Sequence, residues 1–217
     1  MPSSCQILTP RLRCCDNCSH STSWDLVVPR LAASSPLPNK GDHVASDVNL
    51  HQFIIALVEA AYRSIKQATD DLTDEQLYYQ PTAESNSMAW LVWHLSRWRD
   101  FISATVSSEP QIWVSAGWAQ RCGMPDERTG MGDTPGQVTA FRVERDVLFG
   151  YVDAAHQRTI ERVAALTPTQ LEQLIVSHTG EQRPAWRALA GMCGDSAQHA
   201  GQIAYLRGML SGYGWRG

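Results

Sequence analysis

The sequence lacks any long apolar run, and this absence excludes a class of protein. Its 217 residues are 43% hydrophobic, yet no apolar stretch approaches the roughly 18 to 20 residues that a transmembrane helix needs. The first 40 residues carry Arg11, Arg13 and several prolines, without the apolar core of a secretion signal. We therefore expect a cytoplasmic protein with no membrane partner.

An excess of positive charge is also missing. The chain has 18 Lys and Arg against 22 Asp and Glu, which gives a formal net charge of −4. Such a balance supplies no basic surface for a phosphate backbone, and no block of like charges marks an interaction tail. The composition therefore argues against a nucleic-acid partner.

Cysteine is scarce outside the first 18 residues, which hold four of the six. The spacing Cys15-x-x-Cys18 is typical of a zinc knuckle, but a structural zinc usually needs a second ligand pair about 12 to 20 residues further on, and none follows. Residues 1–45 are interpreted instead as a disordered leader or as sequence upstream of the true start codon. The pattern fits reduced thiols better than a disulfide scaffold.

Helical periodicity begins only near Ser46 and dominates the rest of the chain. No segment alternates with period two over a useful length, so strands are absent or short. Residues 46–213 are therefore predicted to form an all-α four-helix bundle domain. The predicted helices span residues 48–68, 87–105, 134–165 and 186–210.

A repeated hexapeptide supports the division into helices. Leu72–Leu77 reads LTDEQL after the first helix, and Leu166–Leu171 reads LTPTQL after the third, which indicates two related halves. The second and third helices are joined by a long loop, residues 107–133. A structureless segment of that length inside a compact domain is usually a lid or a binding loop.

The spacing of apolar residues predicts which face of each helix is buried. On the second helix His94 falls on the apolar stripe, and four polar residues are expected to face outward: Arg97, Arg99, Asp100 and Ser103. On the first helix, the predicted inward face is Leu50, Ile54, Leu57, Val58, Ala61 and Ile65. On the fourth it is Leu189, Met192, Ser196, His199, Ile203 and Leu206.

Asp195 and His199 stand four residues apart, so their side chains emerge from one face of the fourth helix. With His94 they would form a two-histidine, one-carboxylate set that leaves positions open for water or substrate. The alternative is that these are hydrogen-bonded core residues. An ion shared by all three would remove the cost of burying them unpaired, about 1 to 3 kcal/mol each.

The second and fourth helices together resemble a known family. AWLVWHLSRWRD and QHAGQIAYLRG look like the DinB superfamily of bacterial four-helix proteins. Asn86–Trp90, Gln111–Trp113 and Gly117-Trp118 resemble an actinobacterial branch of it. The resemblance covers about residues 48–212, essentially the whole predicted bundle.

The resemblance implies a divalent metal, commonly zinc or nickel, bound by one His of the second helix and two of the fourth. His94 and His199 match two of these ligands, while Asp195 stands where the family normally has His. A carboxylate keeps the site possible and leaves two interpretations open, altered metal preference or a degenerate site. Several relatives are transferases or isomerases that use a thiol such as mycothiol or bacillithiol.

Further residues are candidates for binding a small-molecule substrate. Trp90, Trp113 and Trp118 are candidates for lining a pocket, although tryptophans at helical spacing are more often core residues. Gln202 and Tyr205 are candidates for orienting the substrate. The expected function is thus a metal-dependent thiol S-transferase or isomerase that acts on a small electrophile.

The sequence is also compatible with a function that is not catalytic. The serious alternative is a non-catalytic metal-binding or dimerising stress-response bundle with a degenerate site, and a homodimer is compatible with either function. Asp153-x-x-His156 lacks the partner motifs of a di-iron bundle, and a packed, hydrogen-bonded His156 is the better interpretation. Cys193 is expected to be a buried, inert thiol and not a nucleophile.

Overall fold

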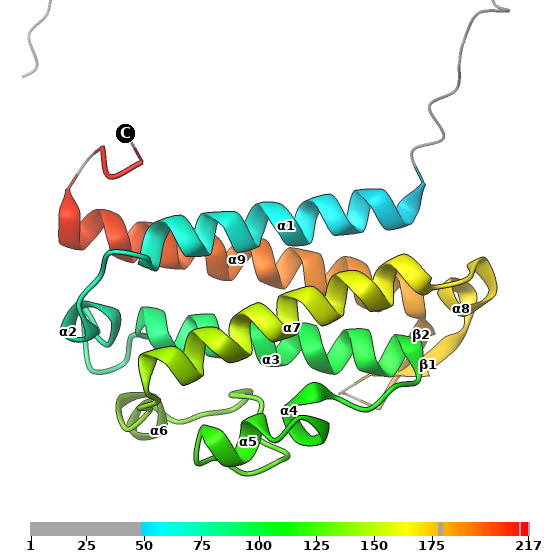
Figure 1. Cartoon of the computed structure of the whole chain (residues 1–217), viewed down its shortest axis with the longest axis horizontal. Coiled ribbons are helices and arrows are strands. Elements are labelled where there is room, and N and C mark those ends of the chain that lie inside the picture. Colours follow the sequence, from blue (N-terminus) through cyan, green and yellow to red (C-terminus); the bar gives the residue numbers. More distant parts are fainter. Residues whose placement is uncertain (1–48, 178–179, 213, 217) are drawn as a thin grey trace, which may run out of the picture. The chain divides into compact units, whose positions relative to one another are not determined.

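The computed structural model describes residues 49–177, 180–212 and 214–216. The predicted leader over residues 1–45, with its cysteine cluster, lies outside them. Long helices alternate with short ones along the described chain (Figure 1). In order, the elements are α1 (Leu50–Thr69), α2 (Asp74–Leu77), α3 (Met88–Ser107), α4 (Ile112–Ser115), α5 (Trp118–Arg121), α6 (Pro135–Thr139), α7 (Arg145–Ala165), α8 (Pro168–Glu172), β1 (Leu174–Val176), β2 (Gln182–Pro184) and α9 (Ala185–Ser211).

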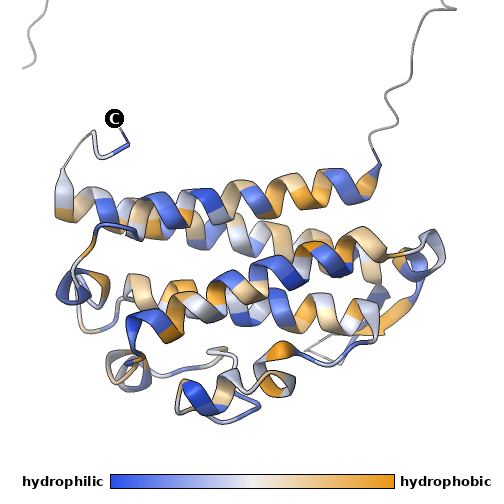
Figure 2. Ribbon diagram, in the orientation of Figure 1, coloured by the Kyte–Doolittle hydropathy of each residue, from blue (hydrophilic) through white to orange (hydrophobic). Residues whose placement is uncertain are grey.

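The four long helices α1, α3, α7 and α9 pack into a bundle. Helix α3 packs against α7 and α9, and α1 packs against the same two helices. The apolar residues that form the core occur on all four of them (Figure 2). The predicted all-α four-helix bundle is confirmed.

Helices α3 and α7 run in the same direction, while α1 and α9 run the opposite way (Figure 1). The chain must therefore return along the bundle between α3 and α7. Helix α7 has 21 residues, which at 1.5 Å per residue is a length of about 30 Å. The connecting segment, residues 108–144, makes this return and contains α4, α5 and α6.

The connecting segment is packed against the bundle, so the prediction of a structureless loop is wrong. Trp113 is completely buried in the core. The carboxylate of Asp100 on α3 accepts hydrogen bonds from the backbone N–H groups of Ile112 and Trp113, at 3.1 and 2.9 Å. This carboxylate thereby holds the start of the segment to the bundle.

The third predicted helix is broken in two. Thr134 caps α6 as predicted, in a capping box with Gln137, but α6 ends at Thr139. The hydroxyl of Tyr78 accepts a hydrogen bond from the N–H of Val143 and donates to the same residue's carbonyl oxygen, 3.0 and 2.5 Å away. These contacts hold Val143 outside any helix, and α7 begins two residues later.

The repeated hexapeptide has the same structure in both places. Thr73 and Gln76 form a capping box at the start of α2, and Thr167 and Gln170 form another at the start of α8. In each box, the Thr hydroxyl accepts a hydrogen bond from the backbone N–H of the Gln. The side-chain oxygen of the Gln in turn accepts a hydrogen bond from the backbone N–H of the Thr. The two halves thus share a capped turn after their first helix.

Helix α3 is buried on nearly all sides, so its predicted outward face is wrong. The four polar residues of that face are each at most 1% exposed: Arg97, Arg99, Asp100 and Ser103. They contact α1, α7, α9 and the connecting segment. Periodicity predicts one buried face, whereas α3 has neighbours on several.

Helix α1 shows the opposite deviation. Its predicted inward residues Leu50 and Leu57 are 44% and 42% exposed, while Ile54, Val58, Ala61 and Ile65 are buried as expected. Despite such exposed apolar side chains, none of the helices in the described ranges is long and apolar enough to cross a membrane.

A short antiparallel hairpin, β1–β2, leads into α9. Its three-residue strands agree with the expectation of few or short strands. Ile175 is buried against the bundle and pairs in register with Arg183. The hairpin therefore places Arg183 beside the start of α9.

Candidate metal site

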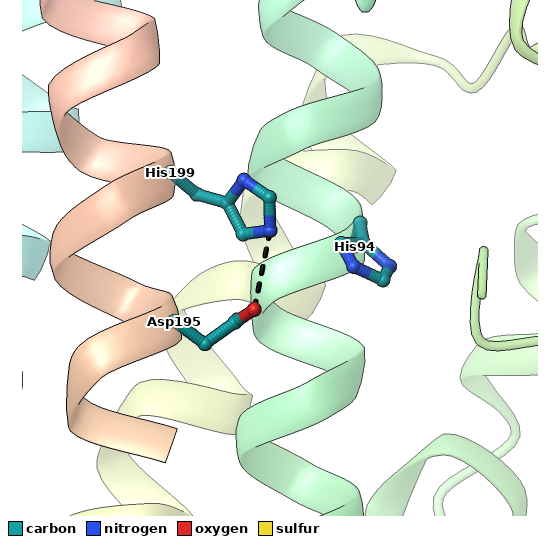
Figure 3. A group of neighbouring side chains, drawn as sticks. All are labelled: His94, Asp195 and His199. Carbon is teal, nitrogen blue, oxygen red and sulfur yellow. Dashed lines mark ion pairs between the residues drawn. The ribbon is translucent and has the colours of Figure 1, made fainter. Parts of the chain in front are cut away.

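Three side chains converge between α3 and α9. His94 projects from α3, and Asp195 and His199 project from successive turns of α9 (Figure 3). One potential ligand atom from each residue lies within 4.8 Å of the others. The structure thus brings together the three residues that the sequence proposed as ligands, here termed the His–Asp–His cluster.

His94 is held in one tautomer. Its Nδ1 lies 2.6 Å from the carbonyl oxygen of Thr129, and because a carbonyl can only accept, Nδ1 carries the proton. Burial lowers the pKa of His94 below the ordinary value and outweighs the hydrogen bond to Thr129, which acts in the other direction. The imidazole is therefore neutral at pH 7, with the lone pair of Nε2 available.

His199 is oriented by two side chains of its own helix. Nδ1 lies 2.7 Å from Oε1 of Gln202, and Nε2 lies 3.3 Å from Oδ1 of Asp195. Burial alone would lower the pKa of His199, but the hydrogen bonds with Asp195 and Gln202 together raise it above the ordinary value. The nitrogen that faces the cluster is thus Nε2, as in His94.

Asp195 supplies an observation that an ion would explain. Its Oδ2 is buried and has no hydrogen-bond partner. An unpaired buried acceptor costs about 1 to 3 kcal/mol, more when it is charged. Two imidazole nitrogens and a carboxylate form a donor set that suits a divalent transition metal, so the residues present fit such an ion.

The connecting segment covers the His94 side of the cluster. The indole of Trp90 stacks on the His94 ring, with centroids 4.7 Å apart. Its Nε1 donates to Asp133 at 2.9 Å, and Arg128 donates to the same carboxylate at 2.8 Å. Gly130 lies against these rings with φ +86°, and a Cβ there would come 2.7 Å from Nδ1 of His94.

The buried guanidinium of Arg99 lies near the cluster. Arg99 is fully buried, and its Nε donates to the hydroxyl of Ser196 at 2.9 Å. Burial lowers the pKa of Arg99 to about 10, while the charge of Asp195 acts in the opposite direction. Arg99 is still cationic at neutral pH and attracts the Asp195 carboxylate.

The residues predicted to bind substrate are dispersed. Trp90 and Gln202 contact the two histidines, as described above. Tyr205 is 73% exposed and lies with Gln202 beside a different, open groove. Trp113 and Trp118 pack around the buried Tyr151 in the core. Neither of these two tryptophans lines the cavity that adjoins the cluster.

Sequence reasoning missed that cavity and the outer partner of His94. Both His94 and Asp195 line a cavity of about 280 Å³, and Arg183 of the hairpin also lines it. No sequence motif pointed to Arg183 or Thr129, because they reach the site only through the folding of the hairpin and the connecting segment.

His156 and Cys193, the other titratable residues of interest in the sequence, lie apart from the cluster. His156 stacks on Tyr62 with centroids 3.8 Å apart, and burial lowers its pKa to about 4. The ring is packed as predicted, but its Nδ1 is buried without the hydrogen-bond partner that was expected of this residue. Cys193 is buried, as predicted, and burial raises its pKa.

Comparisons with known proteins agree with this architecture. A sequence model described as the DinB superfamily matches residues 57–203. A crystal structure of a conserved protein from Enterococcus faecalis has a TM-score of 0.68 and 21% sequence identity, covering 76% of this chain and 98% of that one. At this identity the likeness shows the fold alone. No curated protein sequence matches the chain.

Proposed function

The chain belongs to the DinB superfamily, and from this premise we propose that it is a metal-dependent enzyme with His94, Asp195 and His199 as ligands. More specifically, we propose a thiol S-transferase or isomerase that acts on a small electrophile and uses a low-molecular-weight thiol of the mycothiol type. Zinc or nickel is the proposed metal.

The observation that carries the proposal is the arrangement around the two histidines. Each histidine donates a hydrogen bond from Nδ1 to an acceptor outside the cluster. The acceptor is the carbonyl oxygen of Thr129 for His94 and the amide oxygen of Gln202 for His199. Histidines that bind metals almost always have such an outer partner, which sets the tautomer and the ring orientation. Nε2 of His94 is thereby left for an ion, and Nε2 of His199, which pairs with Oδ1 of Asp195 when no ion is bound, lies next to the unpartnered Oδ2 of that carboxylate.

The charge of the donor set favours an anionic co-ligand. Two neutral imidazoles and one carboxylate would leave a divalent ion with a net charge of about +1. A divalent ion in an open site lowers the pKa of a bound thiol or water, so that an anionic nucleophile exists at neutral pH. With Asp195 in place of a third histidine, the net charge that attracts a thiolate is smaller. It is still positive, so thiolate binding remains favourable.

The protein's own residues would hold the reactants and exclude water. Trp90 and Gly130 cover the His94 ring, and the hydrogen bonds to Asp133 hold this cover in place. His94 and His199 are prevented from rotating by Thr129 and Gln202. Substrate would approach from the cavity that His94 and Asp195 line.

The thiol in this proposal comes from outside the described chain. Cys122 and Cys193 are both buried, and burial raises the pKa of Cys122 to about 11. Neither is in the His–Asp–His cluster. In the proposed transfer the thiol loses its proton to solvent, its sulfur forms a bond to the electrophilic carbon, and the leaving group departs with the bonding electrons.

The metal content of the purified full-length chain tests the first part of the proposal. We expect about one zinc or nickel ion per chain by mass spectrometry, and loss of the ion in His199→Ala. His51→Ala, on α1 outside the cluster, is the matched control and keeps the metal. Absence of stoichiometric metal after reconstitution of the unaltered protein would refute the proposal, and metal retained by His199→Ala would refute the ligand assignment.

Conjugation of mycothiol with 1-chloro-2,4-dinitrobenzene tests the second part. The transfer proposal expects a thioether and chloride, at a rate that falls to the uncatalysed level in His199→Ala. A chain that binds metal but accelerates no thiol reaction with this or other small electrophiles would instead be the non-catalytic metal-binding bundle.

A further inference from the structure

The cavity beside the His–Asp–His cluster has the size of a site for a small molecule. It measures about 280 Å³ and lies between α3, the β1–β2 hairpin and the first half of α9. Pockets that bind small molecules run from about 300 to 1,000 Å³, so this one lies just below that range and suits a compact ligand. His94 and Asp195 line it, which places its contents next to the proposed metal.

Most of the cavity wall is apolar. Trp98 and Phe101 of α3 both line it, with their rings stacked 5.5 Å apart between centroids. Buried Ile102 and Ile175 contribute further apolar surface from α3 and β1. Removing an apolar group from water against such a wall is favourable by about 25 cal/mol per Å². The wall therefore suits a hydrocarbon or aromatic ring.

The α9 wall of the cavity is made of small residues. Ala188, Gly191 and Asp195 follow a spacing of three and four residues and therefore share a face. Glycine inside a helix costs about 1 kcal/mol relative to alanine, yet a Cβ at Gly191 would touch nothing within 4 Å. Packing does not require this glycine, and its effect is to leave space in the cavity next to Asp195.

One cationic side chain lines the cavity. Arg183 pairs with Glu181 at 3.3 Å, and the Glu181 side chain is 76% exposed. An ion pair with so exposed a partner contributes only about 0 to 1 kcal/mol. The pairing of Arg183 with Ile175 across the hairpin fixes its backbone against the apolar wall. A ligand anion can therefore replace Glu181 at little cost.

We propose that this cavity binds a small organic acid, with its apolar or aromatic body against Trp98 and Phe101 and its carboxylate on Arg183. This inference rests on the proposed function in one respect, that the bound acid is the substrate of the metal-dependent reaction. Arg183 is then a specificity-determining residue that selects anionic over neutral substrates.

Calorimetric titration of the full-length protein tests the assignment, with phenylacetate as the probe and phenylacetamide as its uncharged counterpart. Chelator is present throughout, so that the carboxylate cannot bind a metal ion. We expect Arg183→Gln to weaken phenylacetate binding about tenfold, the loss of one charge-assisted hydrogen bond, and to leave phenylacetamide binding unchanged. Equal affinity of the unaltered protein and Arg183→Gln for phenylacetate overturns the proposal.

Filling the cavity gives an independent test. Gly191→Met places a long side chain in the space beside Asp195 and is expected to abolish binding of both probes. Gly194→Met is the matched control, because Gly194 is also an interior glycine of α9 with open space around it but lies on a different groove. Binding of both probes by Gly191→Met with unchanged affinity also overturns the proposal.

Failure of this inference and failure of the proposed function are distinguishable. Probe binding that depends on Arg183 and Gly191 in a chain that takes up no metal supports the organic-acid site and refutes the metal-dependent enzyme. Stoichiometric metal with no probe binding refutes the site and leaves the proposed metal centre intact.

Discussion

Gly130 has the closest contact with the cluster of any glycine in the described chain. Its φ of +86° is strained for other residues, and a Cβ would lie within 3.0 Å of three aromatic side chains, those of Trp90, Trp93 and His94. Backbone strain costs about 1 to 2 kcal/mol, and overpacking adds about 1 to 3 kcal/mol. The loop approaches His94 closely only because this residue has no side chain.

We therefore predict that Gly130→Ala destabilises the protein by about 2 to 5 kcal/mol and weakens metal binding. Gly132→Ala separates the two causes, because Gly132 has φ +78° and nothing within 4 Å of its Cβ position. The Gly132→Ala variant should be destabilised by backbone strain alone and should keep its metal affinity. Urea denaturation and metal titration measure both effects, and equal losses in the two variants would contradict the close-approach argument.

Gln202 acts on the metal through His199. Outer hydrogen-bond partners of metal-binding histidines typically contribute about 10- to 100-fold to metal affinity. We predict that Gln202→Ala weakens zinc binding by that factor with little change in fold stability, since Gln202 is exposed. Gln198→Ala, an exposed glutamine one turn earlier, is the control. Competition titration against a chromophoric chelator measures the affinities, and no difference between the variants would refute the positioning role.

At the scale of the helix, α3 carries charges that hold the connecting segment. Asp100 is completely buried and receives the Ile112 and Trp113 backbone donors together with Nη1 of Arg162 at 2.9 Å. Arg97 donates from Nε to the carbonyl of Arg128 at 3.0 Å. The same helix thus holds the start of the connecting segment and the part of it that lies beside His94.

We predict that Asp100→Ala costs about 3 to 5 kcal/mol, because it removes the completely buried carboxylate that pairs with Arg162 and leaves that guanidinium only its ion pair with the partly exposed Glu109. The segment should also become a target for limited proteolysis between residues 108 and 133. Asp126→Ala, an exposed carboxylate of the same segment, should change stability by less than about 0.5 kcal/mol. Equal stability of the two variants would show that Asp100 does not hold the segment.

At the scale of the whole molecule, metal binding and folding are coupled. An ion that binds only the folded chain at 100 times its dissociation constant adds about 2.7 kcal/mol of stability. For a domain of this size that is a rise in Tm of about 5 to 10 °C. We predict this rise on addition of zinc or nickel, and its absence in His199→Ala. Thermal unfolding followed by circular dichroism measures it.

The rise in Tm should depend on pH in a definite direction. Asp195 and Gln202 outweigh burial and raise the pKa of His199, so without metal this residue stabilises the fold at low pH, and that contribution is lost as pH rises through its folded pKa. The metal must displace the same proton. The increase in Tm on adding metal is therefore predicted to be larger at pH 8 than at pH 6, and the reverse order would contradict the ligand role of His199.

A homodimer is compatible with the sequence, and its formation remains a prediction about the whole molecule. Sedimentation velocity of the purified full-length chain, with and without metal, measures the oligomeric state directly. A single species with the mass of one chain would exclude it.

The sequence by itself determined most of the helices and the ligand spacing. Apolar periodicity and caps such as Thr73 and Thr167 act within a few residues, so the long helices and the repeated turn were predictable, apart from the break between α6 and α7. The four-residue spacing of Asp195 and His199 placed both on one face of α9 for the same local reason. The residue pattern of α3 also placed His94 toward the core.

Only the tertiary structure decided which surfaces are covered and what surrounds the cluster. Arg99 and Asp100 are buried because neighbouring elements cover several sides of α3, which the pattern of a single helix cannot reveal. Thr129 and Arg183 reach the site from the connecting segment and the hairpin, 35 residues or more from His94 in sequence. Their positions depend on long-range packing, and so does the cavity that the proposed substrate would occupy.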